Sequence, residues 1–286
     1  MGVFFALLSS VSFAVSFTLL KRSYKEFSPS VAFFFDMLFG LLLWIPFSLI
    51  LGFDYSHLSK VFVYALISGI LSEAFVFYVL SKGEISITGT IFASYPIYTI
   101  LFSILLLGER LSPLHWFFVF VTILGTFLAS LPAKVTRSEL GKKKYILWAI
   151  AGATAVGFSD TISKGIIDQT SAAAFLFALA IVQIPISLTY LKLEKENYRH
   201  LLYFAKNLEK YKFSLGGSFF NVTGLIGLWL AFEYTYASIA SPLTAAYPGI
   251  MIILAMFFLK ERPRKIELIG LGLILAGILG ISSFFA

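Results

Sequence analysis

Long apolar runs alternate with short polar connections along the whole chain. Ten of these runs are each long enough to cross a bilayer, because a spanning helix needs about 20 predominantly apolar residues. We predict helices at 3–20, 30–51, 61–80, 85–107, 114–131, 146–163, 172–191, 213–233, 237–259 and 266–285. The pattern therefore indicates an all-α membrane protein with ten transmembrane helices.

The two sets of five predicted helices carry the same features at one constant spacing. Tyr95-Pro96, Glu109-Arg110 and Gly125 recur 152 residues later as Tyr247-Pro248, Glu261-Arg262 and Gly277. Several matches at one offset indicate an internal repeat. Because each set has an odd number of helices, the second set must enter the membrane from the opposite side, which predicts two inverted five-helix repeats. We place the repeats at 1–132 and 146–286, joined by a polar linker at 133–145.

The composition indicates that most of the chain is surrounded by lipid. Of its 286 residues, 59% are hydrophobic and only 13% are charged, and the mean hydropathy is +0.90. Ten spans leave no room for a separate catalytic domain. The chain has no cysteine, which excludes disulfides and thiolate metal sites.

The basic residues are concentrated in the connections that follow the odd-numbered helices. These connections hold 19 of the 22 Lys and Arg residues, and the opposite side holds only Lys60, Arg110 and Lys164. The positive-inside rule then places the basic side in the cytoplasm and both termini outside. It also accounts for the formal net charge of +7 without nucleic-acid binding. Lys21 follows the first apolar run instead of preceding it, so we expect a retained helix and not a secretory signal.

The connection between the seventh and eighth predicted helices contains an amphipathic stretch. Leu201, Phe204, Ala205 and Leu208 recur there at helical intervals. This spacing predicts an interfacial helix on the cytoplasmic headgroups, and a solvated loop is the alternative.

Each half ends in a Pro-containing helix, a short Glu-Arg connection and a Gly-rich final helix. The motifs are Tyr95-Pro96 through Leu107-Gly108-Glu109-Arg110, and Tyr247-Pro248 through Leu259-Lys260-Glu261-Arg262. In this the chain resembles, over essentially its whole length, the EamA-type transporters of the drug/metabolite transporter (DMT) superfamily. The resemblance implies a ten-helix fold, a central cavity between the halves, and substrates such as amino acids, other small metabolites or, in related branches, nucleotide sugars.

The chain departs from this family pattern in two respects. Many relatives carry a basic residue near the start of the second helix, where this chain has Phe35-Asp36. Characterised relatives usually place both termini in the cytoplasm, whereas the charge distribution here predicts the opposite orientation.

Glu73 is the strongest candidate for a functional group. It lies about 18 Å deep in the third predicted helix, where an ionised side chain costs about 2.5 to 3.5 kcal/mol on insertion scales. It is either a protonatable or cation-binding group in the central cavity or a neutral acid that ties helices together. Asn221 lies about 12 Å from the opposite face, at the height of Glu73, so the two residues can share a site.

Further polar residues lie inside predicted spans. Asp160 and Lys164 are four residues apart, the spacing at which an acid and a base on one helical face can pair. We expect Asp160 and Gln183 to line the cavity, with interhelical hydrogen bonding as the alternative for Gln183. Asp36 lies nearer a membrane face, so we expect it to contribute less.

Two prolines lie at matching points of the two halves. Pro96 and Pro248 each remove an amide donor from a predicted helix, and we expect a kink at each, either lining the substrate site or serving packing alone. The aromatic residues near these kinks are expected to form cavity walls, and they are Tyr95, Tyr98, Tyr247 and Trp229. For Glu109 and Glu261 we expect a structural role at the start of each final helix.

Taken together, these features predict a secondary active transporter, an exporter or permease of a small metabolite such as an amino acid, that works by alternating access in the cell membrane. The alternatives are a non-transporting membrane receptor or assembly factor, and nucleotide-sugar or drug transport within the same superfamily. No catalytic motif occurs, so an enzyme is not predicted, and neither is a cofactor or a bound metal. A proton or another cation is expected as the coupling ion, and the protein is expected to be a monomer or a homodimer.

Overall fold

The computed structural model describes residues 1–81, 92–131, 143–196, 201, 204–254, 256–257 and 262–283, and it is all-α over these residues. The first half comprises α1 (Gly2–Ser23), α2 (Pro29–Leu51), α3 (Leu58–Ser68), the π-helix η1 (Gly69–Ala74), α4 (Phe75–Ser81), α6 (Tyr95–Phe102), the π-helix η2 (Ser103–Leu107) and α7 (Pro113–Ser130). The second half comprises α9 (Lys143–Ile167), α10 (Ala172–Leu193), the 3-10 turn η3 (Phe204–Asn207), α12 (Leu208–Tyr234), α13 (Ala237–Thr244), α14 (Tyr247–Leu254) and α15 (Lys265–Ser283).

These elements form the predicted transmembrane spans. Within the described residues, nine helical segments are long and apolar enough to cross a membrane, and the shorter apolar segment Tyr95–Leu107 adds the fourth span. The predicted fold class, an all-α membrane protein with ten helices, is therefore confirmed.

The helix boundaries follow from local chemistry. Pro29 and Pro113 occupy the first turns of α2 and α7. Amides in the first turn have no partner within the helix, so the amide hydrogen that proline lacks is not needed there. The Ser112 hydroxyl accepts a hydrogen bond from the amide of His115, and the Ser171 hydroxyl accepts one from the amide of Ala174. Such side-chain caps satisfy donors that a helix start leaves free.

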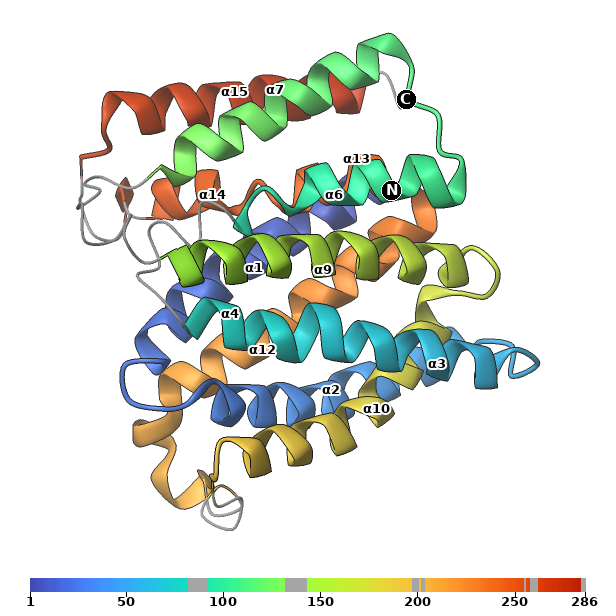
Figure 1. Ribbon diagram of the computed structural model, residues 1–286, viewed down its shortest axis with the longest axis vertical. Helices are drawn as coiled ribbons and strands as arrows, with labels where there is room; N and C mark the ends of the chain where they lie inside the picture. The colour runs from blue at the N-terminus through green and yellow to red at the C-terminus, as the bar shows by residue number, and fades with distance from the viewer. Residues whose placement is uncertain are drawn as a thin grey trace.

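The helices of the two halves pair in matching ways. In Figure 1, α7 and α15 lie together at one edge of the bundle, and α2 and α10 lie together at the opposite edge. Between them α1, the first helix of the first half, packs on α12, the third span of the second half. In the same way α9, the first helix of the second half, packs on α3, η1 and α4, which form the third span of the first half. This exchange of equivalent contacts is what an inverted repeat produces.

Glycine permits the close approach of α7 and α15. A Cβ atom on Gly125 would lie 2.6 Å from the amide nitrogen of Ile274, and one on Gly270 would lie 2.5 Å from that of Ala129. Without a side chain at these points the two backbones can touch, which is the usual basis of helix association in lipid.

The two spans that carry the matched prolines are broken and not merely kinked. In the ninth span, α13 ends at Thr244 and α14 begins at Tyr247 after a turn. In the fourth span, a turn at 93–94 precedes α6, so Pro96 and Pro248 each lie in the first turn of a new helix. At each point where the sequence predicted a kink the structure thus has a turn, and each proline occupies the start of the helix that follows, a position that it fits well.

The amphipathic stretch before the eighth span is only partly described. Residues 204–207 form a single 3-10 turn that leads directly into α12, which begins at Leu208. The predicted interfacial helix also includes residues outside the described part of the chain. The eighth span is longer than expected, because it starts five residues before the predicted Phe213.

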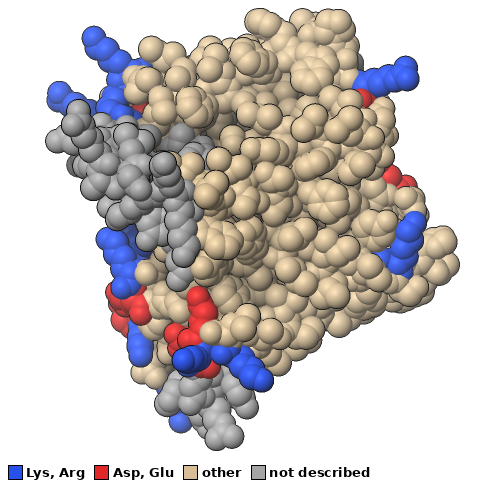
Figure 2. All heavy atoms as spheres, in the orientation of Figure 1, with Lys and Arg blue, Asp and Glu red and all other residues tan. Residues whose placement is uncertain are grey.

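Lys and Arg side chains gather at one end of the bundle, and the other end carries few (Figure 2). We call these the basic end and the opposite end. The start of α1 and the end of α15 both lie at the opposite end (Figure 1). That this end faces outside remains a prediction from the positive-inside rule.

Candidate functional site

A cavity lies between the two halves of the bundle. Its walls come from α1, η1 and α4 on one side and from α9, α12 and α14 on the other, with the start of α6 closing it. Four lining residues are polar: Ser72, Glu73, Asp160 and Asn221. Seven are aromatic: Phe13, Phe17, Phe77, Phe92, Tyr95, Trp229 and Tyr247. The remaining lining residues are aliphatic.

Glu73 reaches this cavity from the π-helical segment η1. Its side chain is almost fully buried, with 3% of its surface exposed. The preceding Ser72 hydroxyl donates to the carbonyl oxygen of Ser68, a local bond of the kind that bends helices. A π-helical turn widens the helix and shifts the direction of its side chains, and such turns are frequent at functional sites. The third span therefore presents Glu73 through a locally altered backbone.

Asn221 lines the same cavity as Glu73 and also bonds a second buried acid. Its amide nitrogen donates to Oδ1 of Asp36 at 3.0 Å. The expectation that Glu73 and Asn221 lie at one height agrees with this geometry, since both residues line the same cavity.

Asp36 contributes more to the polar network than the sequence suggested. Asp36 is fully buried, and its Oδ2 accepts a hydrogen bond from Nε2 of Gln183 at 3.5 Å, in addition to the bond from Asn221. The second helix starts at Pro29, which places Asp36 about 10 Å inside it. That depth agrees with the predicted helix start at residue 30, so it is the two amide donors, and not the depth, that the sequence did not reveal.

Gln183 lies behind the cavity wall. It is fully buried and bonds Asp36, but it is not among the lining residues. Of its two predicted roles, the structure thus shows interhelical hydrogen bonding.

Asp160 is tied to the fourth and ninth spans by a chain of hydroxyl groups. The Thr99 hydroxyl of α6 is 3.3 Å from Oδ2 of Asp160 and donates to it, and the Ser241 hydroxyl of α13 donates to Thr99 at 3.1 Å. The predicted pairing of Asp160 with Lys164 is not found. Lys164 instead forms an ion pair with Asp168, one turn further along.

Three of the four predicted aromatic residues line the cavity. Tyr95, Tyr247 and Trp229 do so, and the Tyr247 ring meets the Phe17 ring edge-on at 4.9 Å. Tyr98 does not line the cavity, because its backbone and Cβ pack against Gly157 of α9. Six of the residues predicted for the site therefore face one space, namely Glu73, Tyr95, Asp160, Asn221, Trp229 and Tyr247.

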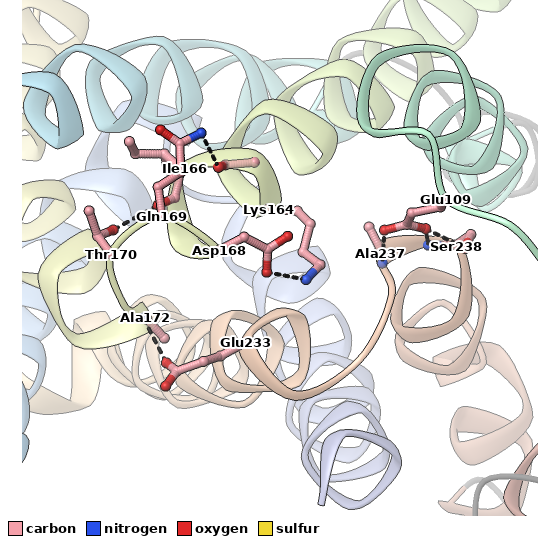
Figure 3. Close-up of polar contacts among 11 residues, drawn as sticks. Glu109, Lys164, Ile166, Asp168, Gln169, Thr170, Ala172, Glu233, Ala237 and Ser238 are labelled. Carbon is pink, nitrogen blue, oxygen red and sulfur yellow. Dashed lines mark hydrogen bonds and ion pairs between the residues drawn. The ribbon is translucent and has the colours of Figure 1, made fainter.

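At the opposite end of the bundle, two glutamate carboxylates accept hydrogen bonds from backbone amides at the N-termini of helices (Figure 3). Glu109 accepts hydrogen bonds from the amides of Ala237 at 2.8 Å and Ser238 at 3.0 Å, and from the Ser238 hydroxyl. Glu233 accepts a bond from the amide of Ala172 at 2.7 Å. Negative groups are favoured at helix N-termini, because free amides and the helix dipole attract them.

The role expected for Glu109 therefore changes. It was expected to serve the start of the helix that follows it, α7, but its carboxylate binds the first residues of α13 in the other half. Its counterpart Glu261 lies outside the described residues.

The three buried carboxyl groups of Asp36, Glu73 and Asp160 have no basic partner among the described residues. Their neighbours are hydroxyl and amide groups, and Lys164, the buried lysine, is bound to Asp168. Within the same residues, no group of three or more His, Cys, Asp or Glu side chains is placed to hold a metal ion. The site can thus bind a positively charged group, and its described residues include no Lys or Arg that would occupy the carboxyl groups.

Comparisons with known proteins agree with this architecture. The sequence model of the EamA-like transporter family matches residues 1–131 and 143–283. A solved structure described as "Crystal structure of protein" is similar over 99% of this chain and 98% of that chain, with a TM-score of 0.73 and 17% sequence identity. At that identity the similarity shows the fold alone. No curated protein matches the chain.

Proposed function

The chain belongs to the EamA-like transporter family, and on that premise we propose that it is a secondary active transporter of a small metabolite, working by alternating access. The resemblance noted in the sequence is thereby confirmed. The family is one of transporters and not of enzymes, and the chain is a multi-pass integral membrane protein. We place it in the cell membrane, with a proton or another cation as the coupling ion.

The observation that carries this proposal is the cluster of buried acids around Asn221. Each carboxylate held ionised at this depth costs about 2.5 to 3.5 kcal/mol on insertion scales. Acids at such depth therefore call for a reason, and proton or ion pathways are the usual one. A transporter needs groups that take up and release positive charge as the cavity changes sides.

The arrangement also supplies the parts that alternating access requires. The cavity lies at the interface of the repeats, beside two spans broken at matching points, as in other transporters with inverted repeats. At the opposite end, Glu109 joins the two halves through α13. We infer that rocking of the halves breaks these bonds and exposes the cavity on that side.

Replacing Glu73 with glutamine tests the coupling role. We expect the Glu73→Gln variant to equilibrate substrate but not to accumulate it under a pH gradient, because glutamine cannot exchange a proton. Melting temperatures against amino acids, nucleosides, sugar phosphates, nucleotide sugars and organic cations first identify a ligand, since one at about 100 times its Kd stabilises the folded state by about 2.7 kcal/mol. Uptake of that ligand into proteoliposomes then measures accumulation.

Asp54→Asn is the matched control, because Asp54 lies in an exposed loop at the opposite end, where it accepts hydrogen bonds from the neighbouring Ser56 and does not line the cavity. This variant should accumulate substrate as the parent does. Full accumulation by Glu73→Gln would contradict the coupling role. A ligand that binds but never crosses would contradict transport and favour the receptor or assembly-factor alternative.

A further inference from the structure

The cavity combines buried acids with aromatic walls, a combination suited to one chemical class of ligand. Glu73 and Asp160 line the cavity. Asp36 does not line it, but it accepts a hydrogen bond from the lining residue Asn221. Around them are the rings of Phe13, Phe17, Tyr95 and Trp229, among others. A cation over the face of an aromatic ring is attracted by the ring quadrupole, and this attraction grows when water is excluded.

The charge of the lining also excludes a class. None of the cavity-lining residues that the structure describes is Lys or Arg. A phosphate or a carboxylate buried here would meet carboxyl groups and no compensating charge, which is strongly unfavourable. Sugar phosphates and nucleotide sugars are thus poor ligands for this space.

Trp229 adds a buried polar group to the residues that line the cavity. Its side chain is fully buried, and its indole nitrogen has no hydrogen-bond partner among the described residues. A buried donor that lacks a partner costs about 1 to 3 kcal/mol, so such groups call for an explanation. A water molecule bound beside the ligand would satisfy it.

We propose that the substrate is a small organic cation, a protonated amine or quaternary ammonium compound with an apolar or aromatic body. The positive group lies between Glu73 and Asp160, and the body packs against the aromatic walls. This inference rests on the proposed transport function and names its substrate class. It also explains why three buried acids have no basic partner among the described residues: the substrate or the coupling ion supplies the positive charge in turn.

Three probes of one skeleton test this assignment: phenylpropylamine, phenylpropanol and phenylpropanoate, which are cationic, neutral and anionic at neutral pH. Binding to the purified full chain in mild detergent is measured by calorimetry. We expect the amine to bind about tenfold or more tightly than the alcohol, a difference of about 1.4 kcal/mol, and the carboxylate not to bind. Glu73→Gln and Asp160→Asn should each weaken amine binding about tenfold and leave alcohol binding unchanged, while Asp54→Asn should change neither.

Folding of each variant is checked by size-exclusion chromatography. If one acid variant fails to fold, the other still tests the assignment, and Trp229→Phe provides a further variant that keeps an aromatic ring. Equal binding of the three probes, tighter binding of phenylpropanoate, or no saturable binding of the amine would each overturn the assignment.

Transport of the trimethylammonium derivative into proteoliposomes separates this inference from the transport function itself. Its permanent charge prevents passive crossing of the bilayer, so uptake above that of empty liposomes supports both. Binding without uptake would contradict transport but leave the ligand class standing. Uptake of an anionic or neutral ligand, with no binding of either cation, would overturn the class and leave transport standing.

Discussion

Asp36 shows how side-chain amides hold a carboxyl group inside this membrane protein. Asn221 and Gln183 donate to its two oxygens from two different helices, α12 and α10. No lysine or arginine takes part among the described residues. Because amides carry no charge, the network leaves the acids free to respond to a cation that enters the cavity. The same bonds join α2 of the first half to two helices of the second.

Replacing Asn221 should therefore affect stability as well as binding. We expect Asn221→Leu to lower the free energy of unfolding by about 1 to 3 kcal/mol, because it leaves the buried Asp36 carboxyl without one of its two donors. The melting temperature in detergent measures this loss. Asn207→Leu is the control, since Asn207 is exposed at the start of α12 and its side chain caps no amide. Similar melting temperatures for the two variants would contradict the structural importance of the Asn221 bond.

The helical elements of the bundle differ in how regular their backbones are. Broken spans carry the prolines near the cavity, whereas the unbroken pair α7 and α15 packs through glycine at the edge. The η1 turn is a third device, because it alters the backbone at Glu73 without ending the helix. Irregular backbone thus occurs near the cavity, where neighbouring protein groups can satisfy it.

Two glycines of α15 provide a matched test of the helix packing. A Cβ on Gly270 would lie 2.5 Å from a backbone nitrogen of α7, whereas a Cβ on Gly272 would meet nothing within 4 Å. We expect Gly270→Ala to destabilise by about 1 to 3 kcal/mol, because one backbone must move. Gly272→Ala should be neutral or slightly stabilising, since alanine favours helix by about 1 kcal/mol. Thermal melts of both variants decide the matter, and equal shifts would argue against a close α7–α15 contact.

The bond from Glu109 to α13 predicts how access at the opposite end is controlled. Leu228 lines the cavity on α12, and the chain has no native cysteine, so Leu228→Cys provides a single labelling site. We expect adding Glu109→Ala to raise the rate at which a membrane-impermeant thiol reagent labels this cysteine from the opposite end, because the α13 amides lose their acceptor. Asp54→Asn, on the same face, should not change the rate. Unchanged labelling with Glu109→Ala would mean that Glu109 does not restrict access.

At the scale of the whole molecule, the two halves enclose the cavity in pseudo-symmetric fashion. Helix pairs such as α2 with α10 and α7 with α15 join equivalent elements, and the acids come from both halves. Most basic side chains gather at one end, and the other end carries few (Figure 2). The asymmetry of charge, and not the symmetry of the fold, is therefore the basis on which we predict the orientation in the membrane.

Reporter fusions at the C-terminus test that orientation. With 19 of 22 basic residues at one end, we expect that end in the cytoplasm and both termini outside. Alkaline phosphatase fused after Ala286 should then be active, and green fluorescent protein at the same point should be dark. The reverse pattern would overturn the orientation and leave the fold unchanged.

The sequence by itself determined the spans, their repeat and the depth of each polar residue. Apolar run length predicts a span, and a rise of about 1.5 Å per residue converts position into depth. This reasoning was enough to place Glu73 and Asn221 at one level, where the structure brings both into the cavity. The constant offset between the halves likewise predicted two inverted five-helix repeats, which the match of the family to both halves supports.

Only the tertiary structure decided which neighbours each side chain meets. Tyr98 turns to α9, Lys164 pairs with Asp168, and Glu109 binds a helix of the other half. The physical reason is that a sequence pattern fixes position along a helix, whereas rotation about its axis and contact across the repeat depend on packing of all the helices together. Asp36 illustrates both: Pro29 fixes its depth, and only the approach of α10 and α12 supplies its two donors.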